Sequence, residues 1–560
     1  MYQITAGLSG RVGIRDWTWD IYASTSRTKY SNEQRGGASA SATAQLLNSP
    51  TGGTEYCQGG FNPFGNLTPS QACIDFISRR TLNTNELKQR TVEGTMQGSL
   101  FALPAGDVRF AVGADYRYNG YSFTPDAQLS LPNGTSDILG YSVLRAASGE
   151  VNVGEAFAEL LVPVLHDLPL IQQLDLDLGY RYSKYDTIGG VHAYKADVTW
   201  RVFEPLRLRG GYNRAIRAPS VGELFAPVST ASVAVGTASS TTTNGDPCDR
   251  RSSYRAGANA AAVRDICLAQ GISPSVYTDY TLGTAQVFAL TGGNPQLKEE
   301  VADTFSAGGV LQSPFAGMFK NLSLSVDFYS IKIKGAVGPL SIAQAFQFCF
   351  NSGGNNPTYS PSNYYCSLIT RNTDTGVPVN PLQPLLNLGT YQVRGVDFQF
   401  DWRFPIGADA GNFAINSAVS YLETFKIQAL PGAPTYDYAG SIGIGVDATG
   451  GIAHPRWKGI TSFTYTLGQA SLGLRWRYLS SMINSAKVVS PTSTTRGVAA
   501  YNVFDLNARF EVDDSTEFRL GATNLFNRAP PQYGDIEATY DAQNYDVIGR
   551  YFFIGATKKF

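Results

Sequence analysis

"VDFQFDWRF", residues 396–404, alternates strictly between apolar and polar side chains. Val396, Phe398 and Phe400 occupy every second position, and Trp402 and Phe404 continue the series. Aspartate, glutamine and arginine fill the positions between them. Because successive side chains of a β-strand point to opposite faces, this stretch predicts a strand with one apolar face and one polar face.

The same alternation recurs from one end of the chain to the other, for example in "LDLDLGYRY" (174–182) and "FDLNARFEV" (504–512). We predict about 17 such strands, many of them about nine to twelve residues long. Strands of soluble proteins average about five or six residues, whereas crossing a bilayer takes about nine to eleven. The predicted strands begin near Tyr2, Trp17, Thr91, Asp107, Glu155, Leu174, Tyr194, Leu206, Ala302, Leu322, Val393, Asn412, Gly459, Ala470, Tyr501, Glu517 and Gly549.

The connections between these strands alternate in length. Tight turns are predicted at 466–470 and 512–516, while long loops are predicted at 30–85, 125–148, 217–296, 337–388, 426–454 and 481–498. The Ser/Thr/Ala-rich segment 228–246 is expected to be loop without a strand. Apolar faces end in aromatic residues, as at Tyr180 and Trp476. These features favour an all-β fold: a transmembrane antiparallel β-barrel with short periplasmic turns and long extracellular loops. The alternative, a soluble β-sandwich or propeller, does not account for the strand lengths or the one-sided loops.

Composition narrows the functional classes. Charged residues make up 16% of the 560 residues, aromatic residues 12%, and the net charge is −1, so nucleic acid is not an expected partner. The three histidines, His166, His192 and His454, lie in no nucleophile motif, and the glycine-containing loops lack a P-loop lysine. We therefore expect neither an enzyme nor a cofactor or metal site. No uncharged apolar run reaches 18 residues, and the N-terminus reads as a strand rather than a signal peptide.

The six cysteines form three local pairs along the sequence: Cys57 with Cys73, Cys248 with Cys267, and Cys349 with Cys366. Loop-closure entropy favours these pairings over the other connectivities that six cysteines allow. The pattern predicts three structural disulfides in an oxidising compartment, with six free thiols as the alternative.

Three motifs resemble those of TonB-dependent outer-membrane receptors. "YNRAIRAPSVGELF", with Arg217 and Pro219, resembles the mid-barrel signature, and "GGNPQLKEE", with Asn294 and Pro295, resembles its partner stretch. The hairpin from Phe504 that contains Asn524 and Phe526 resembles the penultimate one of the family. The last residues, "GRYFFIGATKKF", resemble its terminal strand and end on Phe560.

The resemblance implies a barrel of 22 strands preceded by a plug and an energy-coupling box. This chain departs from that pattern: it is expected to have neither the box nor the plug and to begin partway round the barrel. We expect residues 1–560 to be a partial barrel domain that lacks the plug, the TonB box and roughly the first five strands. Such a barrel would expose two unpaired edges in lipid, so the native protein is expected to be longer.

The function implied by the resemblance is energised uptake of a scarce nutrient across the outer membrane of a Gram-negative bacterium. The TonB–ExbB–ExbD complex would act through the missing N-terminal part, and the ligand would be a siderophore, a vitamin or an oligosaccharide. Loops rich in Tyr, Asn and Gly suit a saccharide-like ligand, and packing of those loops is the simpler interpretation. No ligand-contacting residue is assigned. The main alternative is a passive diffusion porin, and a third, weaker option is a soluble extracellular lectin.

Strand parity gives the two arginines of the first motif different surroundings. Leu206 and Leu208 are expected to face lipid, which places Arg214 outward and Arg217 inward. Arg214 would then meet lipopolysaccharide phosphates among the outer-membrane lipids, and Arg217 would meet loop or plug carboxylates. The motif is therefore interpreted as the outer end of a strand rather than a clamp on substrate.

Overall fold

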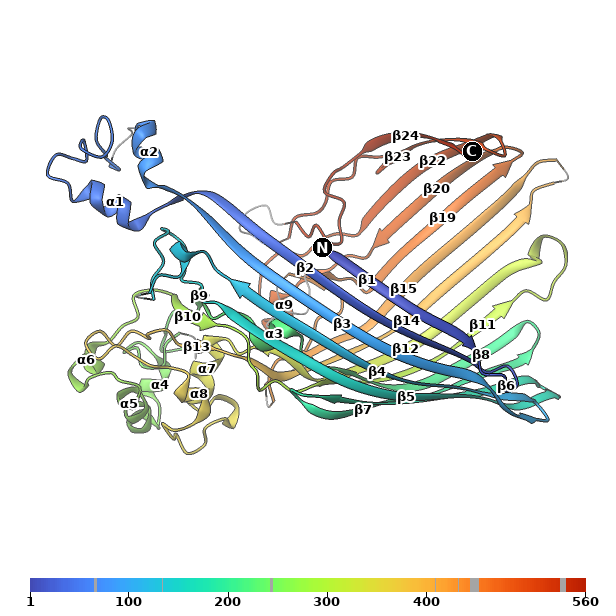
Figure 1. The fold of residues 1–560 in the computed structure, drawn as a ribbon, viewed down its shortest axis with the longest axis horizontal. Coiled ribbons are helices and arrows are strands. Elements are labelled where there is room, and N and C mark those ends of the chain that lie inside the picture. Colours follow the sequence, from blue (N-terminus) through green and yellow to red (C-terminus); the bar gives the residue numbers. More distant parts are fainter. Residues whose placement is uncertain are drawn as a thin grey trace.

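The computed structural model describes residues 1–64, 68–132, 134–241, 245–407, 409–431, 433–443, 453–533 and 540–559. Its dominant feature is an 18-stranded sheet, in which β16 (Tyr436–Asp437) is a two-residue strand and the other 17 form a curved wall (Figure 1). The wall strands are β1 (Tyr2–Arg11), β2 (Thr18–Ala38), β3 (Ser78–Leu103), β4 (Gly106–Thr124), β5 (Ala147–Leu168), β6 (Ile171–Tyr185), β7 (Gly189–Phe203), β8 (Leu206–Arg217), β11 (Glu300–Gln312), β12 (Asn321–Pro339), β14 (Leu385–Pro405), β15 (Asn412–Gln428), β19 (Trp457–Leu467), β20 (Ala470–Leu479), β22 (Tyr501–Asp513), β23 (Thr516–Thr523) and β24 (Tyr551–Lys558).

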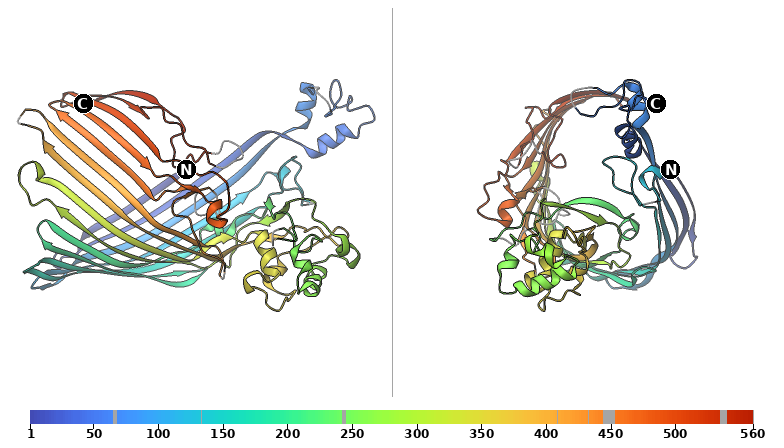
Figure 2. Two further views of the ribbon diagram at one scale, coloured as in Figure 1. Left: turned by 180° about the vertical axis from the view of Figure 1, so that it is seen from behind. Right: turned by 90° about the vertical axis from the view of Figure 1, so that its left-hand side faces the viewer.

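Every wall strand pairs antiparallel with the wall strand before and after it in the chain. The exceptions are the two ends: within the described residues β1 pairs only with β2, and β24 only with β23. The predicted fold class and strand number are confirmed. The sheet curves round a lumen (Figure 2), and among the described residues the outer edges of β1 and β24 have no strand partner.

Side chains alternate between the two faces of the wall as the sequence predicts. On the outer face Leu8, Phe552 and Ile554 are 74%, 73% and 84% exposed, which suits contact with lipid chains. On the inner face Arg209 meets Asp327 across β8, β11 and β12, with a nitrogen–oxygen distance of 2.6 Å. The wall therefore separates an apolar outside from a polar lumen.

The strands are longer than the sequence predicts. β3 has 26 residues, and the predicted start at Thr91 lies well inside it. β5 likewise begins at Ala147 rather than near Glu155. The added residues extend the ladder on the side of the long loops, where both faces meet water and the apolar alternation that reveals a strand fades.

Two predictions about the loops were wrong in detail, and one long loop was not predicted. The loop expected at 30–85 is confined to 39–77, because β2 and β3 continue outward as a hairpin. The segment 228–246 contains strand β9 (Ser229–Ala234), which pairs with β10 (Gln286–Thr291). Residues 524–550 also form a long connection, between β23 and β24, that was not predicted. These pairings depend on distant partners, which local composition does not report.

The long loops gather at one end of the wall and contain the helices (Figure 1). None of the described helices is both long and apolar enough to cross a bilayer. The small elements of the loops are α1 (Ala40–Leu47), α2 (Gln71–Ile77), η1 (Ala127–Leu129), α3 (Val221–Phe225), α4 (Ser253–Ala256), α5 (Ala260–Ala269), α6 (Pro274–Asp279), α7 (Ile342–Cys349), η3 (Ser352–Gly354), α8 (Tyr364–Ser367), β13 (Leu382–Gln383), β17 (Ser441–Ile442), β18 (Ala453–His454), β21 (Ile483–Asn484) and α9 (Ala486–Val489), while η2 (Gly317–Phe319) lies in a turn at the opposite end.

The largest buried cluster lies in these loops, not in the wall. The connections 229–291 and 340–384 pack together around Ile266, Phe346 and Phe350, which are 0–1% exposed. We call this unit the loop body. It lies beyond the outer ends of the strands, over one side of the rim, as the end-on view of Figure 2 shows. Its burial gives the loops a core of their own.

Candidate functional site

Arg217 ends β8 and holds two carboxylates at the outer mouth of the lumen. Its side chain donates from Nε to Glu300 at 2.5 Å and from Nη1 to Glu223 at 2.9 Å, and Nη2 reaches both carboxylates. Glu300 lies directly opposite Arg217 on β11, so both side chains share the lumen face. The predicted inward orientation is consistent with this geometry. Four of the five N–H donors of this guanidinium go to protein carboxylates, so Arg217 serves mainly to hold Glu300 and Glu223 rather than a ligand.

Glu223 connects the arginine to helix α3. Ser220 caps the helix and Glu223 completes a capping box by accepting from the Ser220 amide at 2.7 Å. Partial burial opposes ionisation of Glu223, but the hydrogen bonds from Arg217 and Ser220 outweigh it and hold the pKa of this carboxyl below its usual value. Pro219 precedes the cap, where it has no N–H to continue the strand ladder, and the chain turns there toward α3.

The second motif packs against the first. The Asn294 amide donates to the Glu223 carbonyl at 2.8 Å, and the Asn294 side chain donates to the Leu385 carbonyl at 2.8 Å. A Cβ at Gly293 would lie 2.5 Å from the Leu224 carbonyl oxygen, so this position requires glycine. Pro295 follows directly in the turn that leads to β11. The four motif residues Arg217, Pro219, Asn294 and Pro295 thus join β8, β11 and β14 at the mouth.

A groove of about 620 Å³ opens beside this junction on the lumen side. We call it the mouth groove. Its lining combines hydroxyl, amide and guanidinium groups with a short apolar stretch from the β8–α3 turn, and it contains no carboxylate. The lining residues are Ser26, Thr28, Leu87, Lys88, Gln89, Arg117, Asn119, Gly120, Val151, Tyr185, Ile216, Arg217, Ala218, Pro219, Ser220 and Val221. Such a set can hydrogen-bond a hydroxylated or anionic small molecule.

The polar groups of the mouth groove are positioned by neighbouring strands. Gln89 and Asn119 lie opposite each other on β3 and β4, and the Gln89 amide donates to Asn119 at 3.0 Å. Arg117 contacts Glu155 of β5 at 3.3 Å. None of these groove residues was singled out from the sequence. Strand parity places them on the lumen face, but only the bend of the wall brings them beside Arg217.

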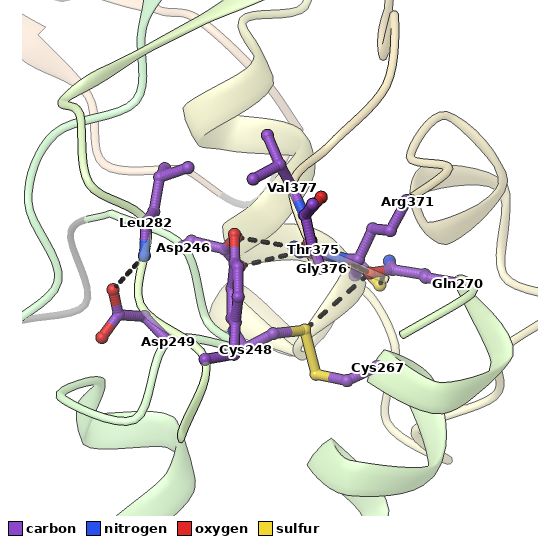
Figure 3. Close-up of polar contacts among 12 residues, drawn as sticks. Asp246, Cys248, Asp249, Cys267, Gln270, Leu282, Arg371, Thr375, Gly376 and Val377 are labelled. Carbon is purple, nitrogen blue, oxygen red and sulfur yellow. Dashed lines mark hydrogen bonds and ion pairs between the residues drawn. A yellow bond between two sulfur atoms is a disulfide. The ribbon is translucent and has the colours of Figure 1, made fainter. Parts of the chain in front are cut away.

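A buried ion pair joins the two halves of the loop body (Figure 3). Arg371 donates to both carboxylate oxygens of Asp246, at 2.6 and 2.7 Å, and both side chains are 0% exposed. Gln270 accepts from Arg371 Nε at 2.9 Å, and the Tyr280 hydroxyl donates to Asp246 at 2.8 Å. Burial raises the pKa of the Tyr280 hydroxyl, as does the nearby Asp246 charge. Since the charges are fully satisfied, the network fixes the connection between loops 125 residues apart.

The cysteines lie where the sequence predicts crosslinks. The structure joins Cys57 to Cys73, Cys248 to Cys267 and Cys349 to Cys366, with Cα atoms 4.9, 5.9 and 4.8 Å apart. The second and third pairs lie in the core of the loop body. The first joins the turn after α1 to α2, and Leu46 of α1 packs against it, at the outer end of the β2–β3 hairpin.

The residues of the penultimate-hairpin motif, Asn524 and Phe526, lie directly after β23. Asn524 is fully buried with φ of 52°, and its amide donates to Asp505 at 2.9 Å while its side chain exchanges hydrogen bonds with Arg528. Phe526 is 71% exposed and packs edge-on against Phe504 of the outer face. Phe560 lies outside the described residues. Asn524 therefore shapes the start of the 524–550 connection, and Phe526 extends the apolar band.

The histidines lie on separate elements. His166 contacts its neighbour Asp167, His192 lies 2.6 Å from the Tyr180 hydroxyl, and His454 stacks on Phe425. The described part of the chain holds no group of three or more His, Cys, Asp or Glu side chains that could bind a metal.

Comparison with known proteins places this geometry in a family. The family profile described as "TonB dependent receptor-like, beta-barrel" matches residues 3–525. The fold is similar to the ferric enterobactin receptor of Pseudomonas aeruginosa in complex with enterobactin (15% identity, TM-score 0.58) and to the siderophore receptor PirA of Acinetobacter baumannii (13% identity, TM-score 0.54). Each match covers 100% of this chain and 62% of the other. The sequence matches no curated protein.

Proposed function

Because this chain belongs to the TonB-dependent receptor-like β-barrel family, we propose that it is the wall of an outer-membrane receptor for energised nutrient uptake. The family is one of receptors and transporters, and its members are outer-membrane proteins of Gram-negative bacteria. In this role the TonB–ExbB–ExbD complex supplies the energy and outer-membrane lipid and lipopolysaccharide surround the wall. The ligand is a scarce nutrient: a siderophore, a vitamin or an oligosaccharide.

The observation that carries the proposal is the mouth groove. It lies at the loop end of the lumen, its lining is polar, and Arg217 and Pro219 of the family motif form part of its edge. A molecule captured among the loops meets this groove as it enters the lumen. The loop body lies at the same end of the wall and is held by two disulfides and a buried ion pair, which favours a mouth of fixed shape and selective capture over free diffusion.

The two free edges support a further part of the proposal. Among the residues that the structure describes, β1 and β24 each have one edge without a strand partner, and lipid offers the backbone groups of such an edge no hydrogen-bond partner. We propose that the residues 1–560 form the C-terminal part of a larger barrel. Additional strands, together with a plug and a TonB box, complete the receptor.

The ligand class follows from the groove and from the similar structures. Hydroxyl and amide groups suit a hydroxylated molecule, and Arg117, which Glu155 holds in place, can donate to an anionic one. Two of the similar structures are siderophore receptors, one of them with enterobactin bound. Ferric siderophores are therefore the first class to test, ahead of oligosaccharides and vitamins.

Ligand binding tests the proposal. Ferric siderophores, oligosaccharides and cobalamin are titrated against the protein isolated from outer membranes, followed by intrinsic fluorescence. We expect one class to bind, and Gln89→Ala/Asn119→Ala to weaken that binding about tenfold through lost hydrogen bonds. The control Gln399→Ala/Asn416→Ala removes two amides from strands β14 and β15, outside the groove, and should leave affinity unchanged. Equal loss in both variants would exclude the mouth groove as the ligand site.

A further inference from the structure

A second cavity, of about 670 Å³, lies on the inner face of the wall across the neighbouring strands β20, β22, β23 and β24. Four arginines take part in its lining: Arg475 and Arg477 of β20, Arg509 of β22 and Arg519 of β23. We call these four the luminal arginine cluster. The mouth groove is lined by strands between β2 and β8 and shares no residue with this cavity, so the two are separate sites.

Strand register places the arginines on the lumen face. Arg509 lies directly opposite Arg519, and Arg475 lies opposite Asp505, which precedes Arg509 on β22 by two turns of the alternation. Phe510, the neighbour of Arg509, is 48% exposed on the outer face, so the arginines point inward. Like charges directly opposite each other destabilise a sheet unless an anion lies between them.

The protein supplies that anion only in part. Glu517 is 2.9 Å from Arg509 and 3.3 Å from Arg519, and Glu511 also pairs with Arg509. The side chain of Arg519 is 57% exposed, and among the described residues its guanidinium donates otherwise only to the Thr557 hydroxyl, at 3.5 Å. One carboxylate therefore serves two opposed arginines, and Arg519 keeps donors that could reach a ligand.

The two carboxylates that line the cavity are both engaged by Arg477. Its guanidinium donates to Asp505 at 3.0 Å and to Asp546 at 3.3 Å, and Asp505 also accepts from the Asn524 amide. Arg475, opposite Asp505, is exposed and forms no hydrogen bond or ion pair with any residue that the structure describes. The cavity thus contains an arginine whose charge the described chain does not neutralise.

The other side of the lumen carries the opposite charge. Glu93, Asp115 and Glu155 lie in direct register on β3, β4 and β5, across the lumen from the luminal arginine cluster (Figure 2). The two arginines beside them, Arg117 and Arg181, both pair with Glu155. An anion in the lumen is therefore repelled from that side and attracted toward β20, β22 and β23.

We propose that the luminal arginine cluster binds small molecules that carry two or more carboxylates. The guanidinium fork matches the carboxylate group and can donate two hydrogen bonds to it. Arg475 and Arg509 are separated by about 14 Å of strand, which suits several spaced anionic groups better than one compact anion. A nutrient with such groups would rest here between the mouth groove and the periplasmic turns. That role rests on the proposed function, whereas carboxylate binding itself does not depend on it.

Calorimetric titration of the protein isolated from outer membranes in detergent tests the proposal. The probes are butane-1,2,3,4-tetracarboxylate, its uncharged tetramethyl ester and inorganic phosphate. We expect the tetracarboxylate to bind at least about tenfold tighter than either of the others, because only it can engage separated arginines through charge-assisted hydrogen bonds. Equal affinity for the ester or for phosphate, or no binding of the tetracarboxylate, would overturn the proposal.

Matched variants locate the site. Arg475→Gln/Arg519→Gln should lose at least about tenfold in affinity for the tetracarboxylate, through the lost charged hydrogen bonds. Arg475→Gln alone removes no contact within the described chain, so its expected loss of about threefold or more does not depend on a change in folding. Arg201→Gln/Arg207→Gln removes two arginines that lie opposite each other on β7 and β8, outside the cavity, and should bind within about twofold of the wild type.

Unchanged affinity in the cluster variants, or equal loss in the Arg201→Gln/Arg207→Gln control, would overturn the proposal. The nutrient is titrated against Arg475→Gln/Arg519→Gln in parallel. Its binding at the mouth groove should be unchanged, so that failure of the proposed function is seen separately from failure of the luminal site.

Discussion

Arg217 and Glu300 lie directly opposite each other on β8 and β11, and the arginine Nε donates to the glutamate at 2.5 Å. The same guanidinium holds Glu223 of the next helix. One side chain therefore ties the end of a wall strand both to its neighbour and to the start of the loop that leads to the loop body.

Replacing Arg217 with alanine should loosen that loop. The change leaves Glu300 and Glu223 without their shared partner, at a cost of about 1.5–3 kcal/mol for hydrogen bonds to charged groups. We expect hydrogen exchange in residues 218–299 to rise at least about tenfold while ligand preference stays the same. Arg214→Ala, on the outward side of the same strand, is the control and should leave this exchange unchanged. A shifted ligand preference with unchanged exchange would show that Arg217 contacts substrate.

Replacing Arg371 with methionine should destabilise the loop body strongly. Asp246 would remain buried without its partner, and breaking a buried ion pair in this way costs about 3–5 kcal/mol. Limited proteolysis of 229–291 and 340–384 measures the effect. Arg371→Met/Asp246→Leu removes both charges and should recover most of the resistance. If the double variant is as labile as the single one, packing rather than charge pairing holds the two loops together.

The wall could be predicted from the sequence because its signal is local. Alternation at "VDFQFDWRF" depends only on which face of the strand is apolar, and it identified the 17 wall strands. The outer parts of β3 and β5 were not predicted as strand, because their two faces meet the same solvent and their side chains do not alternate. The ion pair between Arg371 and Asp246 could not be predicted for another reason: the two residues are 125 positions apart and no sequence pattern links them.

Part of the candidate site could also be predicted from the sequence, and part could not. The motifs pointed to Arg217 and Asn294, and parity gave the inward orientation of Arg217. The "LKEE" sequence that ends with Glu300 was a usable signal for its partner, because it opens the strand that pairs with β8. The mouth groove had no such signal, since its lining comes from six wall strands and the turn after β8.

Removing the Cys248–Cys267 disulfide should weaken the loop body without affecting the wall. The crosslink closes a loop of 19 residues, for which about 3 kcal/mol of stabilisation is expected. In Cys248→Ser/Cys267→Ser, proteolysis of the loop body should accelerate, while the wall keeps its resistance to unfolding in detergent. Cys57→Ser/Cys73→Ser, at the hairpin tip, should leave the loop body intact. Loss of both regions together would mean that the wall depends on the loops.

Acid should loosen the loop body through Asp249. Burial opposes ionisation of this carboxyl, but hydrogen bonds from Arg251 and from the Leu282 amide outweigh it and hold its pKa below the usual value. Its stabilisation is therefore complete above the unfolded pKa of about 3.9 and is lost as the pH falls through the lower folded value. Pepsin cleavage of the loop body should rise below about pH 4, and Asp249→Asn should cleave readily at higher pH. An acid profile that is identical in Asp249→Asn and wild type would assign the effect to another group.

Energised uptake tests the central claim most directly. Accumulation of the nutrient identified by binding is measured in intact cells that carry the protein, with and without TonB and with and without a protonophore. The account predicts saturable uptake that falls to the level of cells lacking the protein when either TonB or the proton-motive force is removed. Uptake that persists without both, and rises linearly with nutrient concentration, would contradict the receptor and identify a passive pore.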